Sequence, residues 1–200
     1  MYTSSLFLEE EGGGSPAKRR RTVHVGLDVG APAGTPVYAF ADGVVHATGY
    51  NPQLGDYGHV VVVAHVLAGR RRWNRKARAA EEDTATVYAL YGHLGARGSK
   101  GRRPGRTVRK GQVVGYVGNV AENGGWTGEW LLPLLRHADC FFLCRVFSRF
   151  FPGDEGTHLH FQLAVHPPKT HDMPGAVAMV NREEALLEYV DPRYVVGELY

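Results

Sequence analysis

The sequence contains few cysteines: Cys140 and Cys144 are the only two in 200 residues. Their spacing forms neither a C-x-x-C motif nor the set of paired cysteines that holds a small secreted domain together. A disulfide-stabilised scaffold is therefore not expected, and the cysteines indicate no particular cellular compartment.

Long apolar runs are also absent. The most apolar stretch, 130–151, is interrupted by Pro133 and by four charged residues, so no segment reaches the roughly 18 residues of a membrane span. The first ten residues lack the basic, apolar and small-residue parts of a secretory signal. The sequence as written therefore predicts no transmembrane segment and no signal peptide, which makes a cytoplasmic location the expectation.

What is present is a globular composition. The 22.0 kDa chain is 44% hydrophobic and 22% charged, which fits one domain with a real core and excludes collagen, coiled coil and general disorder. The 26 glycines and 11 prolines indicate many turns and therefore short strands. The ten histidines are a high count and the first indication of chemistry.

The net charge is +3, but the basic residues are concentrated in three stretches. Four lie in 18–21, six in 70–78 and seven in 97–110, together 17 of the 23 Lys and Arg. Such stretches can contact an anionic polymer. Only Trp73 accompanies the charge, without regular aromatic spacing, so solvated loops are the favoured interpretation and nucleic acid is not an expected partner.

The domain organisation follows from changes in composition and residue pattern along the chain. We expect a disordered polar leader over 1–21 and one β-rich domain over 22–200. Short strands joined by glycine turns predict a mainly β fold with an antiparallel sheet, in which the valine run of 58–66 is covered on both faces. The expected elements are a hairpin over 35–50 around Asp42-Gly43, strands over 58–66, 84–94 and 157–165, a strand pair or bent strand over 108–118, and charged loops over 67–83 and from residue 95 onward.

The segment 127–156 differs from the rest of the domain. It contains EWLLPLLRHADCFFLCRVFSRFF, without strand alternation and with partly helical spacing, so we expect an insertion that contains one or two amphipathic helices. Two explanations stay open: a lineage-specific insertion, or translated non-coding sequence. Sequencing the mature transcript across this segment decides between them.

Two spacings among histidine and aspartate residues indicate a metal-binding or catalytic site. In His24-x-x-x-Asp28 the even separation puts both side chains on one face of an extended chain, about 13 Å apart if straight, so a bend near Gly26 must bring them together. In His158-Leu159-His160 the two imidazoles share one face of a strand. Two histidines and one carboxylate are the ligand set of a catalytic zinc ion, which leaves the remaining histidine as a base or hydrogen-bond donor.

In sequence order, the segments HVGLDVGAPAGTPVYAFADGVV, YGHVVVVAH, VYALYGHL, VRKGQVVGYVG and HLHFQL resemble the lysostaphin-type (LytM-like) zinc metallopeptidases, metallopeptidase family twenty-three. The resemblance implies a β-sandwich of the duplicated hybrid motif type. The stretches NGGW and DPRYVVGEL resemble a subgroup that is fused to kinase-like and class III aminotransferase modules. In that subgroup only a few residues separate the tryptophan from the H-x-H strand, whereas 31 lie between Trp126 and His158 here.

The resemblance also implies roles for matching residues. His24, Asp28 and His160 match the ligands of a Zn²⁺ cofactor, and His93 and His158 match two catalytic histidines. The implied activity is hydrolysis of Gly- or Ala-containing peptide bonds in peptidoglycan-type cross-links by a zinc-activated water. The expected partner is therefore a peptide or peptidoglycan-like substrate, with anionic polymer contact through the basic loops as a further option.

The remaining histidines are expected to have structural or surface roles. These are His46, His59, His65, His137, His166 and His171. Tyr91, two residues before His93, is expected to pack in the core, with a place along the groove as the less favoured option.

Two other functions stay open at this stage. One is a catalytically inactive accessory or binding module, suggested by the insertion and by the missing export signal. The other is a lipoyl- or biotinyl-type carrier domain, suggested by KGQVVGYVG, although no modifiable lysine lies between two hydrophobic strands. The filled ligand and catalytic positions favour the peptidase.

Overall fold

The computed structural model describes residues 21–74, 79–99, 101–126 and 157–196. The expected leader lies outside this part of the chain except for Arg21, which begins a strand. The insertion 127–156 and its expected helices also lie outside the described residues. Within them, no helix is long and apolar enough to cross a membrane.

One antiparallel sheet dominates the part of the chain that the structure describes. Its strand order is β11–β9–β6–β5–β4–β7, and β2 also pairs with β9. The antiparallel prediction is therefore confirmed. The strands are β2 (Leu27–Gly30), β4 (Gly43–Asn51), β5 (Gly58–Asn74), β6 (Ala79–Leu94), β7 (Thr107–Val108), β9 (His158–Ala164) and β11 (Tyr189–Val190).

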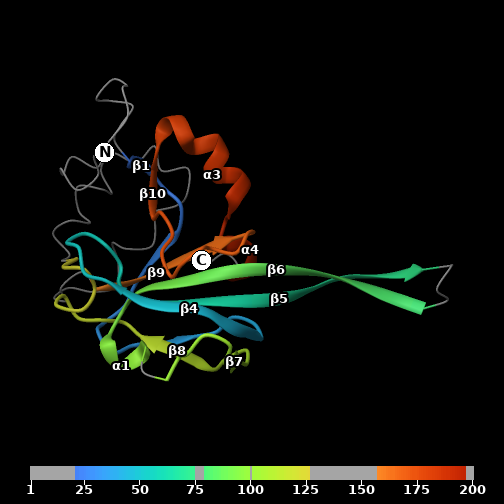
Figure 1. Cartoon of the computed structure of the whole chain (residues 1–200), viewed down its shortest axis with the longest axis horizontal. Coiled ribbons are helices and arrows are strands. Elements are labelled where there is room, and N and C mark those ends of the chain that lie inside the picture. Colours follow the sequence, from blue (N-terminus) through green and yellow to red (C-terminus); the bar gives the residue numbers. More distant parts are fainter. Residues whose placement is uncertain (1–20, 75–78, 100, 127–156, 197–200) are drawn as a thin grey trace.

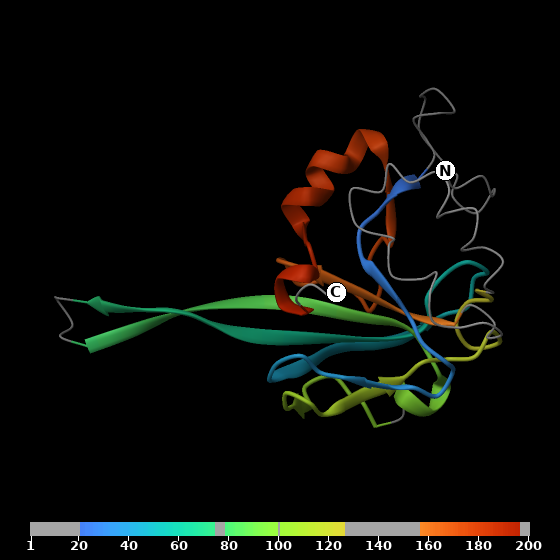
Figure 2. The same cartoon turned by 180° about the vertical axis from the view of Figure 1, so that it is seen from behind.

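Two small antiparallel sheets flank this large sheet. One pairs β1 (Arg21–His24) with β10 (Ala176–Ala178), and the other pairs β3 (Pro36–Tyr38) with β8 (Val113–Tyr116). In both views α3 and β10 lie on one side of the large sheet, and α1 and β8 on the other (Figures 1 and 2). The helices are α1 (Ala96–Ser99), α3 (Arg182–Glu188) and α4 (Arg193–Val196), with a 3₁₀ turn at Met179–Asn181.

The valine run of β5 forms the centre of the core. Val61 and Val63 pack into a cluster with residues of β3, β8 and β9, whereas Val60 and Val62 pack on the opposite face with Tyr57. All four valines are fully buried. Because successive side chains of a strand point to opposite faces, this burial confirms that both faces of the strand are covered.

The charged segment 67–83 is not a loop, contrary to the sequence prediction. Strands β5 and β6 continue through it as a long two-stranded hairpin, with Leu67 opposite Ala85 and Asn74 opposite Ala79. The hairpin extends well beyond the body of the domain (Figure 1). The sequence of its outer part does not alternate apolar and polar residues, so it carries no strand signal there.

The expected hairpin over 35–50 is also wrong, and the two short strands in and beside 108–118, β7 and β8, pair with other strands and not with each other. Strand β3 pairs with β8, whereas β4 pairs with β5 and β7, so the chain changes sheets at Asp42-Gly43. The Asp42 carboxylate accepts a hydrogen bond from the Lys110 amide (2.7 Å) instead of closing a local turn. The Asp-Gly signal therefore marks a crossing between sheets.

Candidate metal centre

A bend between β1 and β2 brings His24 and Asp28 together, as their spacing predicts. The two strands are separated by Val25-Gly26, and the Val25 amide donates to the Gly175 carbonyl (3.0 Å). His24 Nε2 lies 3.4 Å from Asp28 Oδ2. A side chain at Gly26 would meet His160, since an added Cβ would lie 2.4 Å from His160 Cε1.

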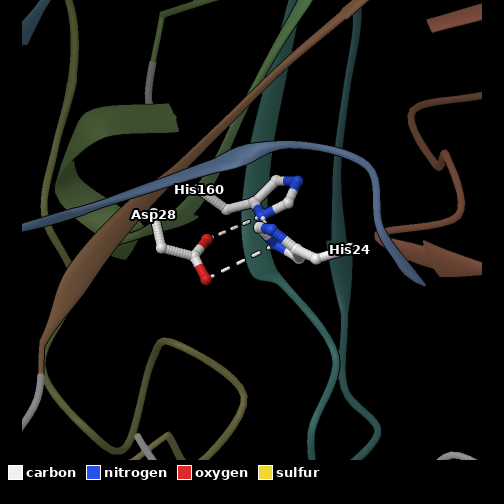
Figure 3. A group of neighbouring side chains, drawn as sticks. All are labelled: His24, Asp28 and His160. Atoms are coloured by element: carbon white, nitrogen blue, oxygen red, sulfur yellow. Dashed lines mark hydrogen bonds and ion pairs between the residues drawn. The ribbon is translucent and has the colours of Figure 1, made fainter. Parts of the chain in front are cut away.

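The pairing of β2 with β9 adds the third residue. Asp28 lies directly opposite His160 in the register, and His160 Nδ1 is 2.9 Å from Asp28 Oδ1 and 3.2 Å from His24 Nε2. Figure 3 shows the three side chains pointing toward one another. One ligand atom from each residue lies within 4.8 Å of the others. The residues fit a zinc ion, because two imidazoles and one carboxylate are a common set of catalytic zinc ligands.

The charges within this cluster are strongly coupled. Burial alone would raise the pKa of the Asp28 carboxyl, but the charges of the neighbouring His24 and His158 and the close polar contacts with His160 and His24 hold it well below its ordinary value. Burial would lower the pKa of His24, but the Asp28 carboxylate raises it overall. The cluster therefore contains an ionised carboxylate, the form that binds a cation.

The other two predicted residues lie beside this cluster. The rings of His93 and His158 have centroids 4.4 Å apart, and both side chains are buried. His158 Nε2 is 4.0 Å from Asp28 Oδ1. The structure therefore brings all five predicted site residues together, although β9 and the end of β6 are distant in sequence from β1 and β2.

His93 has an unusual backbone conformation. Its φ is 57°, and no other non-glycine in the described residues has a positive φ. Its amide donates to the Tyr57 carbonyl (2.9 Å), and its own carbonyl accepts from the Gly118 amide (2.8 Å). Residues held in the left-handed region are often found at functional sites, where surrounding bonds maintain the conformation.

The hydrogen bonds of His93 define its tautomer. Nδ1 lies 2.8 Å from the Asn123 carbonyl oxygen, which can only accept, so Nδ1 carries the proton and Nε2 of the neutral ring is free of one. Burial, together with the nearby His158 and His160, holds the pKa of His93 well below its ordinary value. His93 is therefore neutral at pH 7.

Three further residues of the site, Tyr57, Trp126 and Gln162, have no role that the sequence predicts. Tyr57 packs against His160 with ring centroids 4.9 Å apart. The Trp126 ring contacts the rings of His93 and His158 edge to face, with centroid distances of 5.8 Å and 5.9 Å. Gln162 contacts His160 directly. Only Gln162 had a usable signal, since it follows His160 by two residues on the same strand face. Tyr57 and Trp126 reach the site through loops.

Most other histidines have the structural or surface roles that the sequence predicts. His46 donates to the Pro168 carbonyl (2.9 Å), and His166 is exposed beside Glu188. His171 is half-buried rather than on the surface, because it bonds to Asn51 Oδ1 (2.7 Å). Tyr91 is buried in the core and does not line the site. His59 stacks on Tyr50, and His137 lies outside the described residues.

His65 makes the stability of the fold sensitive to acid. This fully buried ring donates from Nδ1 to the Asp42 carbonyl (3.2 Å), so Nε2 accepts from the Tyr91 hydroxyl (3.2 Å). Burial lowers the pKa of His65, and hydrogen bonds to backbone carbonyls offset this only in part. Its contribution to stability is present above the unfolded pKa and is lost as the pH falls below about 6.5.

We therefore expect the free energy of unfolding to fall below about pH 6.5, with each proton taken up adding a slope of at most about 1.4 kcal/mol per pH unit. The His65→Gln variant should have a shallower slope, because Gln does not titrate. Urea unfolding between about pH 5 and pH 7.5 measures both slopes. His166→Gln, at an exposed site, is the control and should follow the wild type. Parallel curves for His65→Gln and the wild type would contradict the prediction.

Comparisons with known proteins identify the family of the chain. The profile of "Peptidase family M23" matches residues 22–131, which include His24, Asp28 and His93, while β9 lies beyond the match. The chain is 33% identical over 103 residues to the "DD-carboxypeptidase/endopeptidase Mpg" of Neisseria meningitidis and Neisseria gonorrhoeae, and 37% identical over 97 residues to an uncharacterised protein of Haemophilus influenzae. The matches cover 52% and 48% of this chain, and 18% of the relatives in each case.

Two solved structures are also similar. One is the catalytic domain of lysostaphin from Staphylococcus simulans, with 16% sequence identity and a TM-score of 0.39; the match covers 81% of this chain and 78% of that one. The other is the catalytic domain of a mutant of the prophage-encoded M23 protein EnpA from Enterococcus faecalis, with 20% sequence identity and a TM-score of 0.40; the match covers 86% of this chain and 95% of that one. Because the family profile covers more than half of the residues, the chain belongs to peptidase family M23.

Proposed function

We propose that this chain is a zinc-dependent metalloendopeptidase that hydrolyses Gly- or Ala-containing peptide bonds of the peptidoglycan type. The observation that carries the proposal is the convergence of His24, Asp28 and His160, whose ligand atoms lie within 4.8 Å of one another. A zinc ion bound there would supply Lewis acidity, which lowers the pKa of water and polarises a carbonyl group.

The chain's own residues supply the remaining chemistry. His93 is neutral, and its unprotonated Nε2 is suited to take a proton from water that attacks the peptide carbonyl. His158, beside both His93 and Asp28, is suited to donate a hydrogen bond to the oxygen on which charge develops. The edge-to-face contacts of Trp126 with both rings restrict their orientation.

The substrate class is supported by the relatives. The Neisseria proteins are named as a carboxypeptidase and endopeptidase, which supports a peptidoglycan-type peptide as the substrate class. This chain spans only 18% of their length, so the substrate of the whole relatives is a proposal for this chain. Arg103, Arg106 and Arg109 are exposed along the loops on both sides of β7 and could contact an anionic polymer. Fusion to kinase-like and aminotransferase modules, and the cytoplasmic location, stay predictions.

The first experiment measures zinc per chain together with hydrolysis. We expect about one zinc ion per wild-type chain, and none in His24→Ala or His160→Ala. The wild type should cleave tetraglycine or purified peptidoglycan, lose this activity with a chelator and regain it with zinc. His46→Ala, which removes an imidazole outside the site, is the control and should retain zinc and activity. Hydrolysis that persists in His160→Ala would contradict the proposal.

The alternative function is an inactive accessory module that keeps the fold and the metal. All five site positions are filled in this chain and lie together, which favours the peptidase. Zinc binding and tight peptide binding without turnover would favour the alternative.

A further inference from the structure

We propose that Gln162 is a positioning residue for the metal centre. It accepts a hydrogen bond from His160 Nε2–H and so leaves His160 Nδ1 unprotonated and directed at Asp28 and His24. This inference rests on the proposed function, because it concerns how one proposed zinc ligand is held in its binding form.

The contact between Gln162 and His160 is short and fully enclosed. Both residues lie on β9, two positions apart on the same face, and neither is more than 2% exposed. His160 Nε2 is 3.0 Å from Gln162 Oε1. Because the amide oxygen can only accept, this contact is a hydrogen bond when Nε2 of His160 carries the proton.

A second hydrogen bond fixes the orientation of the Gln162 amide. Its Nε2 donates to the Pro174 carbonyl oxygen (3.3 Å), which can only accept, so the amide oxygen must face His160. The neighbouring Gly175 carbonyl accepts from the Val25 amide at the bend between β1 and β2. The turn at Pro174-Gly175 therefore holds both the bend that places His24 and the amide that orients His160.

Tyr57 supports this arrangement without replacing it. Its hydroxyl donates to Gln162 Oε1 (3.3 Å) and lies 3.4 Å from His160 Nε2, farther than the glutamine oxygen. An added Cβ at Gly175 would lie 2.3 Å from the Tyr57 hydroxyl, so the same turn closes over the phenol. The amide oxygen of Gln162 is thus the primary acceptor, and Tyr57 polarises it.

The positioning matters because a second acceptor competes for the same proton. A neutral imidazole has one N–H, and Asp28 Oδ1 lies 2.9 Å from His160 Nδ1. Without the Gln162 oxygen, the proton would move to Nδ1, where it bonds to Asp28 and removes the lone pair that a metal needs. Partners behind a metal-binding histidine act in this way and typically change metal affinity by about 10–100-fold.

The test compares two substitutions at position 162. Gln162→Leu removes the acceptor, and we expect zinc affinity, measured by chelator competition, to fall by about 10–100-fold. Gln162→Glu keeps an oxygen toward His160 while losing the bond to Pro174, and should retain most of the affinity. Leu163→Ala, on the opposite face of β9, is the matched control: it should lower the thermal unfolding temperature without changing zinc affinity.

A second readout needs no metal. In ¹H–¹⁵N spectra of the metal-free protein, the His160 proton should be on Nε2 in the wild type and on Nδ1 in Gln162→Leu. An unchanged tautomer and affinity in Gln162→Leu would overturn the inference, as would an equal loss in Gln162→Glu. If the wild type binds no zinc, the proposed function fails, while the tautomer still decides the role of Gln162.

Discussion

Replacing His93 by asparagine is expected to lower kcat/KM for peptide hydrolysis by about 10²–10⁴-fold, the usual contribution of a general base, while zinc stays bound. The unprotonated Nε2 of His93 is lost, whereas His24, Asp28 and His160 are untouched. Asparagine is the suitable replacement because φ is 57° at this position, a conformation that asparagine tolerates better than alanine does.

His158→Ala provides the companion measurement. Removal of a donor to the developing negative charge should lower kcat by about 10²–10³-fold, again with zinc bound. Both variants are compared with His59→Ala, at a ring that stacks on Tyr50 outside the site. A zinc-loaded His93→Asn enzyme with wild-type kcat/KM would remove His93 from the mechanism and leave His158 as the base.

Gly26→Ala is expected to abolish zinc binding. An added Cβ would lie 2.4 Å from His160 Cε1 and 2.5 Å from Nε2, closer than real Cβ atoms approach other atoms. His160 has no space to move into, because Tyr57 and Gln162 pack against its ring. The ring must therefore leave its position between Asp28 and His24, or the bend between β1 and β2 must open.

Zinc per chain and thermal unfolding, measured together, check this prediction. Overpacking of a core typically lowers stability by about 1–3 kcal/mol, so Gly26→Ala should remain folded while it loses the metal. Gly95→Ala is the matched control: its added Cβ would lie 3.2 Å from the end of the Glu122 side chain and at an ordinary contact distance, 3.5 Å, from Gly118 Cα. Wild-type zinc affinity in Gly26→Ala would show that His160 is not held where the structure places it.

The candidate metal centre could be predicted from the sequence because each part depends on short spacings. Strand alternation places His158 and His160 on one face, and the separation of His24 from Asp28 requires the bend that Gly26 provides. The structure confirms both. His93 matched a motif, but its positive φ and its bond to the Asn123 carbonyl depend on tertiary contacts that no local pattern encodes.

The residues that support the cluster were harder to predict. Tyr57 reaches His160 from a position 103 residues away, and Trp126 reaches His93 from a loop. Nothing in their neighbourhood distinguishes them from ordinary packing aromatics. The outer part of the β5–β6 hairpin was missed for a different reason: its sequence does not alternate apolar and polar residues, which is the signal that predicts a strand.

That ribbon has a consequence for how the protein behaves at high concentration. Strand β4 pairs with β5 only as far as His65, and β9 pairs with β6 only from Tyr88 onward, so in the described residues each outer strand has one neighbour. Its free backbone donors and acceptors form two open edges, the usual template for edge-to-edge aggregation. The sequence of 70–83 is rich in Arg, Lys, Glu and Asp, and charged residues in such a segment oppose aggregation because burying their charges in a growing sheet is unfavourable.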